Sequence, residues 1–275
     1  MSAPSPVTNV LHKLVTHKGA SNGARAIPEE IAVAFTYGSA TFAVMMATPS
    51  DIEDFAVGFS LTEGIIENAS EIAAIEIVPH DQSFEARIAL NENRDAQLLS
   101  RRRQLAGPAG CGLCGIESLE AALRPAREVK ANLRVDASTI FAALRALREC
   151  QHLNQATHAV HAAGFWSAAR NRLLAMREDV GRHNALDKLA GALARERVDS
   201  ASGFVVLSSR LSIELVQKAA MIGCPMLVAV SAPTNFALRA AEAAGMTLIA
   251  VAREDSFEVF THPERVLTAA LDEAG

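Results

Sequence analysis

The second half of the chain alternates short apolar runs with amphipathic segments, and this pattern limits the fold more than any other feature of the sequence. The apolar runs have the length of buried strands, and the segments between them have the period and length of helices. Strands are expected at 160–166, 173–177, 204–207, 226–230 and 247–252, and helices at 140–150, 183–193, 211–222 and 235–244. Because continuous apolar strands need cover on both faces, the pattern predicts an α/β fold, a mostly parallel sheet with helices on both faces.

The first half has the pattern of a smaller α+β region. Two β-like runs, at 31–35 and 41–46, surround Tyr37-Gly38-Ser39, a combination that predicts a hairpin. Thr48-Pro49-Ser50-Asp51 has the composition of a helix N-cap at Thr48 with Pro49 at the first helical position, and the apolar face from Ile52 predicts that this helix continues to Gly64. Two further strands are expected at 72–78 and 84–90.

The expected domain organisation follows from these changes of pattern. Residues 1–27 contain Pro, Ser, Asn and Gly without a clear period, so they are expected to form a flexible N-terminal arm or one loose strand. Residues 28–130 are expected to form the N-terminal α+β region with a cysteine loop. Residues 131–275 are expected to form the C-terminal α/β region that binds a cofactor, with a last helix from the capping box at Thr261.

Charge and cysteine content exclude several classes of protein. The chain has 26 Lys and Arg against 31 Asp and Glu, and its one cluster of like charge is Arg101-Arg102-Arg103. Proteins that bind nucleic acid usually show a basic face, so no nucleic-acid partner is expected. No run of eighteen apolar residues occurs, so no membrane association is expected. With no leader-like N-terminus and only four cysteines, a cytoplasmic location is expected.

The sharpest local motif is the cysteine pair Cys111-Gly112-Leu113-Cys114-Gly115. It follows a Gly/Pro-rich loop at 106–110 and precedes a helical pattern at 116–123, and a helix N-terminus favours the reactive thiolate. Three interpretations compete. A structural zinc site would have to add His158 and His161 from far along the chain, and a thioredoxin-like dithiol would lie just after the first strand of its domain. A thiol that carries sulfur between two partners needs a mobile, exposed loop, and the loop composition favours this third interpretation.

Polar segments follow several of the expected strands. In Arg177-Glu178-Asp179-Val180-Gly181-Arg182-His183-Asn184, the positive charges of Arg182, His183 and Lys188 suit a phosphate-bearing ligand at a helix N-terminus. Further polar junctions lie at 208–210, 231–235 and 252–256. Each could be an ordinary capped turn, but parallel strands bring such junctions to one sheet edge, where they could surround one polyanionic ligand. The remaining cysteines, Cys150 and Cys224, are expected to be small core residues.

Together these segments resemble the formate dehydrogenase accessory sulfurtransferase family of the FdhD type. The resemblance extends from about Pro28 to Thr261 and depends on the order and spacing of its motifs. The motifs are 45–59, the cysteine pair at 111–115, 178–185, 216–220 and 231–234. The sequence departs from the family at Thr157-His158-Ala159, where many relatives have Thr-Gly-Gly.

The resemblance implies a cytidine-deaminase-like fold and a sulfurtransferase activity. Such proteins accept sulfur as a cysteine persulfide from a cysteine desulfurase and pass it to the molybdenum bis(molybdopterin guanine dinucleotide) cofactor, which formate dehydrogenase requires. By motif position, Cys111 would carry the persulfide and Cys114 would be its companion. The family also implies a homodimer that interacts with a cysteine desulfurase and with formate dehydrogenase. GDP would be a partial mimic of the bound cofactor.

The cofactor-binding residues implied by the resemblance and by the polar junctions lie in three segments. They are Val251, Ala252, Arg253, Glu254, Asp255 and Ser256, then Gly181, Arg182 and His183, and finally Ser231 and Thr234. No residue is expected to hold a metal directly. The main alternative is a chaperone that binds the molybdenum cofactor without sulfur chemistry. A zinc hydrolase of the deaminase type is disfavoured, because Ala163 stands where its acid would follow His161.

Overall fold

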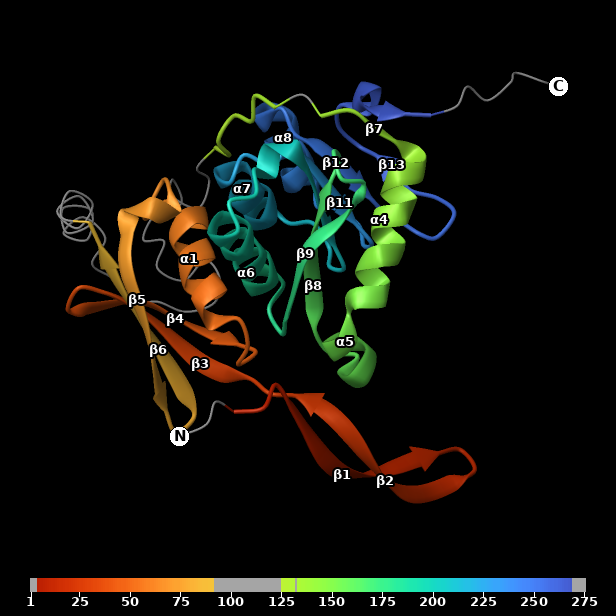
Figure 1. The fold of residues 1–275 in the computed structure, drawn as a ribbon. Coiled ribbons are helices and arrows are strands. Elements are labelled where there is room, and N and C mark those ends of the chain that lie inside the picture. Colours follow the sequence, from red (N-terminus) through yellow and green to blue (C-terminus); the bar gives the residue numbers. More distant parts are fainter. Residues whose placement is uncertain (1–3, 92–124, 132, 269–275) are drawn as a thin grey trace. The chain divides into compact units, whose positions relative to one another are not determined.

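A computed structural model describes residues 4–91, 125–131 and 133–268 (Figure 1). The chain divides into two compact units. The described residues of unit 1 are 4–91, Gln151–Ala162 and Arg177–Arg195. Unit 2 comprises Arg124–Cys150, Ala163–Met176 and Glu196 onward, so unit 1 takes in two segments from the second half of the chain.

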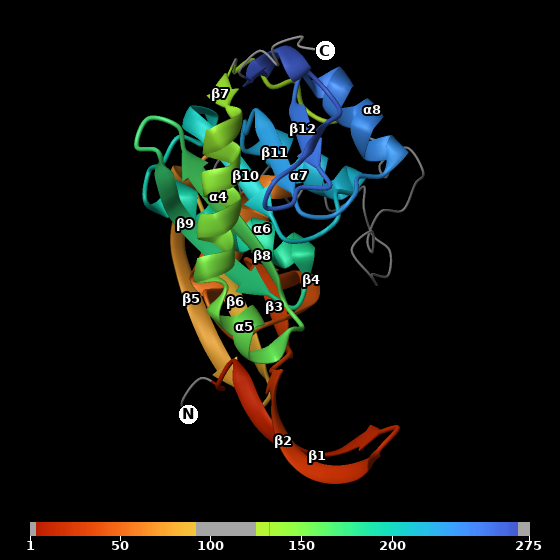
Figure 2. The same ribbon diagram turned by 90° about the vertical axis from the view of Figure 1, so that its right-hand side faces the viewer.

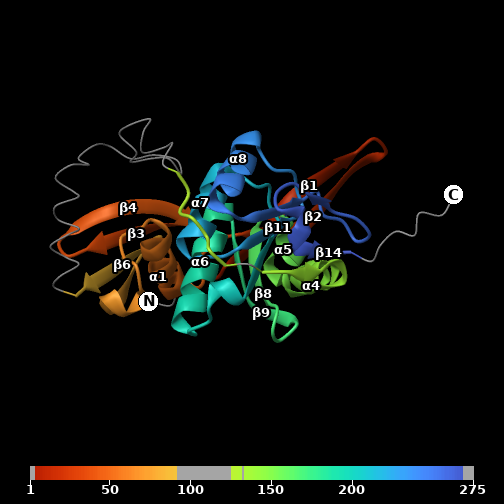
Figure 3. The same ribbon diagram turned by 90° about the horizontal axis from the view of Figure 1, so that it is seen from above.

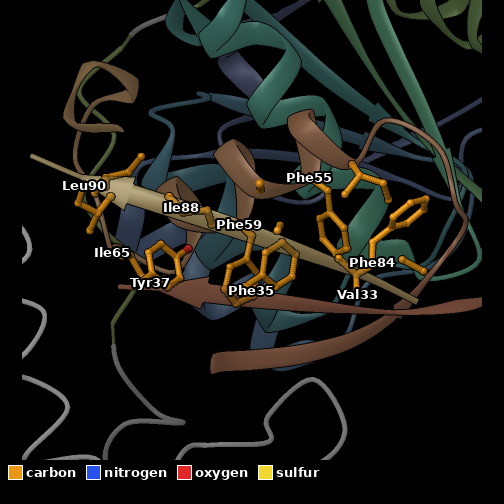
Figure 4. Close-up of a cluster of buried hydrophobic side chains, with 14 of the residues drawn as sticks. Val33, Phe35, Tyr37, Phe55, Phe59, Ile65, Phe84, Ile88 and Leu90 are labelled. Carbon is orange, nitrogen blue, oxygen red and sulfur yellow. The ribbon is translucent and has the colours of Figure 1, made fainter. Parts of the chain in front are cut away.

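Unit 1 is built on a four-stranded sheet, and its strands lie at the four places where the sequence predicts strands. The strand order is β4 (Ala40–Ala47), β3 (Ile31–Tyr37), β6 (Ser83–Leu90) and β5 (Ile72–His80), and only β3 and β6 run parallel. The side chains of one face form an aromatic core, in which the ring of Phe35 stacks on Phe59 at 4.3 Å and meets Phe55 edge-on at 4.9 Å (Figure 4). The core joins the sheet to helix α1 (Ile52–Thr62).

Helices α1 and α6 (Arg182–Arg195) lie side by side at very short range (Figure 3). A Cβ atom on Gly58 would lie 1.6 Å from the carbonyl oxygen of Asp187, and one on Gly191 would lie 1.8 Å from that of Asp54. Both distances are far below van der Waals contact, so only glycine permits this approach of the two backbones. The approach brings the N-terminal loop of α6 to the segment that precedes α1.

The first strands of unit 1 form a hairpin of β1 (Val7–Thr16) and β2 (Gly19–Pro28), where the sequence predicts a flexible arm or one loose strand (Figure 2). Gly19, with φ of 138°, follows the two-residue turn, and the Val and Thr residues of β1 favour the extended backbone. The short helix α5 (His152–Thr157) also belongs to unit 1.

A six-stranded sheet forms the centre of the α/β half. Its order is β13 (Glu258–Val259), β12 (Thr247–Ala250), β11 (Met226–Ala229), β10 (Gly203–Leu207), β8 (His161–Ser167) and β9 (Arg172–Asp179). The central strands β10, β11 and β12 run parallel (Figure 2). They are buried throughout, while β8 pairs antiparallel with β10 and β13 pairs antiparallel with β12. Helices α4 (Ala137–Cys150), α7 (Ile213–Met221) and α8 (Asn235–Ala244) accompany them. The predicted α/β class is confirmed.

Two helix starts predicted from capping motifs are wrong. Helix α1 begins at Ile52 after Asp51, which has φ of 54° and no side-chain cap, so Thr48 does not cap it. At Thr261 no α-helix begins: a 3-10 turn (Pro263–Arg265) leads into β14 (Val266–Leu267), which pairs with β7 (Val135–Asp136). The Thr261 hydroxyl instead donates to the Met246 carbonyl and accepts from the Leu248 amide, each at 2.7 Å.

Two further 3-10 turns complete the secondary structure, at Ala69–Glu71 and Ser200–Ser202. None of the helices in the described part of the chain combines the length and the apolar character needed to span a membrane.

Candidate functional site

The two cysteines of the Cys-x-x-Cys motif, Cys111 and Cys114, lie outside the described residues. The two described cysteines differ from each other. Cys224 is completely buried, burial raises the pKa of its thiol to about 11, and its Sγ donates to the Met226 carbonyl at 3.3 Å. Cys150 is a free, half-buried thiol on α4. Cys224 is therefore a small core residue, as its sequence context predicts.

The loop between β9 and α6 is organised by the buried carboxylate of Asp179. Its Oδ2 accepts from the backbone amide of Thr48 at 3.0 Å and from Nζ of Lys188 at 2.6 Å. Its Oδ1 accepts from the amide of Gly181 at 2.8 Å and from Nδ2 of Asn184 at 2.9 Å. Both carboxylate oxygens thus have two donors each, which is what a buried carboxylate requires.

Lys188 is the cationic partner of this carboxylate, and its ammonium group is not accessible to a ligand from solvent. Its side chain is 0% exposed, its Nζ also donates to the Thr48 carbonyl at 2.9 Å, and it lies 5.6 Å from the ring centroid of Phe55. Burial lowers the pKa of Lys188, and the adjacent carboxylate of Asp179 opposes this shift. The expectation that Lys188 adds positive charge to a phosphate site is therefore wrong.

Thr48 connects this loop to the segment before α1. Its hydroxyl accepts from the amide of Val180 at 3.1 Å, while Nδ2 of Asn184 donates to the carbonyl of Met46 at 2.8 Å. The sequence suggests a helix cap at Thr48, and nothing local indicates that its polar groups bind a loop more than 130 positions later. Thr48 is thus a residue of the site that sequence reasoning missed.

Gly181, Arg182 and His183 follow Asp179 at the start of α6, and all three are half-buried. Across the described residues, Nε of Arg182 is buried and has no hydrogen-bond partner. Burial lowers the pKa of the nearby His161, the positive charge of Arg182 lowers it further, and Asp179 opposes both effects. The loop therefore places the guanidinium of Arg182 near the imidazole of His161 in β8, which burial favours in its neutral form.

The charged residues that flank this loop are engaged within unit 1. Glu178 accepts from the amides of Leu153 and Asn154 at 2.9 and 2.8 Å, where α5 begins. Arg177 donates through Nε and Nη2 to one oxygen of Asp54 at 2.9 and 2.7 Å, and Arg195 donates to the other oxygen at 2.5 Å. These interactions connect β9 to α1 and α5, and they connect α6 to α1.

In unit 2, the carboxyl ends of the parallel strands β10, β11 and β12 meet at one edge, as the sequence predicts. The loops that leave them are joined by backbone hydrogen bonds. The Leu211 amide donates to Ala232 at 3.2 Å, the Thr234 amide donates to Leu211 at 2.9 Å, and the Val251 amide donates to Ser231 at 3.2 Å. The structure thus brings Ser231 and Thr234 together with the 251–256 segment.

Thr234 has an ordinary structural role at this edge. Its Oγ1 accepts from the Ala237 amide at 3.2 Å and caps α8. Ser231 is exposed. A ligand at this edge would therefore meet Ser231 more readily than the hydroxyl of Thr234.

The loop after β12 has an unusual backbone. Val251 has φ of 52°, a left-handed conformation that a β-branched residue adopts only where its surroundings impose it. The next amides are fixed, since Ala252 donates to Ala229 at 3.1 Å and Arg253 donates to Ser256 at 2.7 Å. Nη1 of Arg253 donates to the carbonyls of Val230 and Ala252 at 2.6 and 3.0 Å, so one nitrogen anchors the guanidinium.

Arg253, Glu254, Asp255 and Ser256 are all exposed. Glu254 pairs with Arg148 of α4, and the hydroxyl of Ser256 donates to Asp255 at 3.1 Å. The edge therefore presents an anchored guanidinium beside carboxylates and hydroxyls. This set of groups suits a ligand that carries phosphates together with hydrogen-bond donors.

Comparisons with known proteins agree with one another. The FdhD/NarQ family model matches residues 28–267. A protein of Agrobacterium fabrum named sulfur carrier protein FdhD is 52% identical over 248 residues, 90% of this chain and 91% of that protein. A Xanthomonas axonopodis pv. citri protein of the same name is 47% identical, covering 87% of this chain and 85% of that protein. A crystal structure from Desulfotalea psychrophila, titled as a formate dehydrogenase accessory protein, matches with a TM-score of 0.77 at 25% identity, covering 96% of this chain and 100% of that one.

Proposed function

Since the chain belongs to the FdhD/NarQ family, we propose that it is a sulfur carrier that serves formate dehydrogenase. The observation that carries the proposal is the match of nearly the whole chain to proteins named for sulfur carriage, at up to 52% identity. The exposed polar edge of unit 2 supports it, because a carrier of this kind needs a surface where a large anionic substrate can bind.

In this proposal, Cys111 accepts the sulfur. Its thiolate attacks the outer sulfur of a persulfide on a cysteine desulfurase. A new S–S bond forms on Cys111, the S–S bond of the donor breaks, and the donor cysteine leaves as a thiolate, so no external oxidant or reductant is needed. Cys114 is the companion thiol. The protein acts as a sulfurtransferase in the cytoplasm and as a homodimer.

The sulfur acceptor is the molybdenum bis(molybdopterin guanine dinucleotide) cofactor of formate dehydrogenase, bound as a substrate. The 251–256 loop would bind one guanine nucleotide arm. Arg253, anchored through Nη1, would direct its remaining N–H groups to the phosphates. The carboxylate of Asp255 suits the N–H donors of guanine. Within unit 1, Gly181, Arg182 and His183 are proposed to bind phosphate groups.

The sulfur-carrying role of Cys111 can be tested by intact mass after incubation with a desulfurase and cysteine without reductant. We expect a gain of one sulfur in the wild type and in Cys150→Ala, a matched control cysteine, and no gain in Cys111→Ala. A persulfide that persists in Cys111→Ala would refute the assignment. If Cys111→Ala still supports active formate dehydrogenase in cells, the chaperone without sulfur chemistry is the better description.

The binding of a guanine nucleotide can be tested by calorimetry with GDP. We expect Arg253→Ala to weaken GDP binding about tenfold or more, since charge-assisted hydrogen bonds are lost. Arg170→Ala, an exposed arginine in the turn between β8 and β9, is the control and should bind like the wild type. Equal affinity of all three proteins would remove Arg253 from the site.

A further inference from the structure

The hairpin of β1 and β2 exposes more large apolar side chains than any other element of the described chain. Leu11 is 90% exposed, Val15 is 70% exposed and Leu14 is 52% exposed. Val10 and Ile27 add exposed fractions of 40% and 37%. Half of the large exposed hydrophobic residues in the described ranges thus lie on one hairpin.

The pairing of the two strands places these residues on both faces. Leu11 pairs with Ala24 and Val15 pairs with Ala20, so an apolar stripe follows one face. Val10 and Leu14 follow the other face. In the described chain the two strands form a sheet of their own, without a third strand. Such a hairpin is marginally stable in water, so a second surface must cover it for the ten-residue strands to persist.

The charge of the hairpin is opposite to that of the rest of the chain. Residues 1–28 contain Lys13, Lys18 and Arg25 and no Asp or Glu. Residues 29–275 contain the other 23 Lys and Arg and all 31 Asp and Glu. A basic, apolar hairpin is therefore attached to an acidic body. Strand β2 contacts α5 of the same unit, while Leu11, Leu14 and Val15 of β1 stay exposed.

We propose that the β1–β2 hairpin is a docking arm that packs on the acidic body of a second copy of this chain. Opposite charge favours arm-to-body contact, whereas two arms of like charge would repel each other. The hairpin has no aromatic residue, which a segment that binds a membrane surface usually carries. The arm rests on the two-copy state proposed above, and it is independent of the sulfur chemistry.

Sedimentation of the full-length protein over a range of concentrations tests the arm. We expect Leu11→Ser combined with Val15→Ser to raise the dimer dissociation constant about 100-fold or more, because two buried apolar side chains are lost from each arm. Ser21→Ala combined with Asn22→Ala, at exposed positions of the same hairpin, is the matched control and should leave the constant unchanged. A wild type that stays monomeric, or a Ser variant with an unchanged constant, would overturn the proposal.

Charge reversal tests the electrostatic part. Dimerisation of the wild type should weaken as salt rises, and Lys13→Glu with Lys18→Glu and Arg25→Glu should weaken it further at low salt. Equal dimerisation of the reversed variant and the wild type at low salt would exclude an acidic docking surface. Sulfur loading measured by mass should persist in the monomeric variants, so failure of the arm and failure of sulfur carriage give different results.

A crosslinking experiment keeps the proposal testable if a variant loses its strand structure. A photoreactive amino acid in place of Leu11 should link to residues 29–268 of another copy, as mapped by mass spectrometry in a mixture of isotope-labelled and unlabelled chains. Links only within one chain, or links only between two arms, would refute docking on the body. Binding of the wild type to anionic phosphatidylserine vesicles, with loss of the dimer, would assign the arm to a membrane surface instead.

Discussion

The loop after β9 and the loop after β12 are both candidate anion sites, but different forces hold them. Asp179 fixes the first loop with a buried carboxylate that accepts four hydrogen bonds, one of them from the buried Lys188. The second loop is held by backbone hydrogen bonds and by Arg253, which binds two carbonyls at the surface. The first loop therefore depends on charge in the interior, and the second depends on backbone conformation.

The difference predicts how the two loops respond to substitution. A buried ion pair is costly to break, because removing one partner leaves the other charged without compensation. A loop held by backbone bonds tolerates the loss of a side chain, since most of its hydrogen bonds remain. Substitutions of the buried Asp179–Lys188 pair should mainly change the stability of the protein. Substitutions at the exposed residues 253–256 should mainly change the binding of a ligand.

The largest effect is expected for Lys188→Met. The Asp179 carboxylate would lose its buried cation, and we expect the free energy of unfolding to fall by about 3–5 kcal/mol, as measured by chemical denaturation. Lys130→Met, at an exposed lysine, is the control and should change stability by less than about 0.5 kcal/mol. Asp179→Asn combined with Lys188→Met should recover part of the loss, because no unpaired charge remains. Equal stability of Lys188→Met and wild type would show that the pair does not hold the first loop.

A smaller effect of opposite sign is expected for Val251→Gly. Glycine adopts φ of 52° without the cost of about 1–3 kcal/mol that a valine bears, although it loses about 0.5–1 kcal/mol of chain entropy and some packing. We expect stability between unchanged and about 1 kcal/mol higher by thermal unfolding. Val228→Gly, in the buried strand β11, should instead lose about 3 kcal/mol or more. A loss of that size in Val251→Gly would mean that packing, and not strain, dominates at this position.

Most strands and helices could be predicted because their apolar residues repeat with the period of the element they form. The predicted meeting of the 231–235 and 252–256 junctions also followed from general geometry, since parallel strands end at one edge. Cys224 was correctly predicted as a core residue because it precedes a continuous apolar strand. These features depend on local composition and on rules that hold for any parallel sheet.

The errors at Thr48, Thr261 and Lys188 have one physical cause, which is that a polar side chain can bind a distant partner. The hydroxyls of Thr48 and Thr261 bind a loop and a strand end instead of capping helices. Lys188 appears from its neighbours to be a surface cation, yet Asp179 allows it to be buried. The left-handed backbone of Val251 could not be predicted either, because valine is among the residues that disfavour it.

The smallest effect concerns His161, which reports on the charge of the first loop. Its pKa is lowered by burial and by Arg182, so the unfolded chain binds a proton more readily below the ordinary pKa of 6.5. The contribution of His161 to stability is therefore present above pH 6.5 and falls as the pH drops through the range between the ordinary pKa and the lowered one. Removing the positive charge in Arg182→Gln should raise the pKa of His161, as measured by NMR titration of the imidazole. Arg172→Gln, at the opposite end of β9, should leave that pKa unchanged. If Arg182→Gln left it unchanged as well, the guanidinium would lie too far from the imidazole to contribute to an anion site beside it.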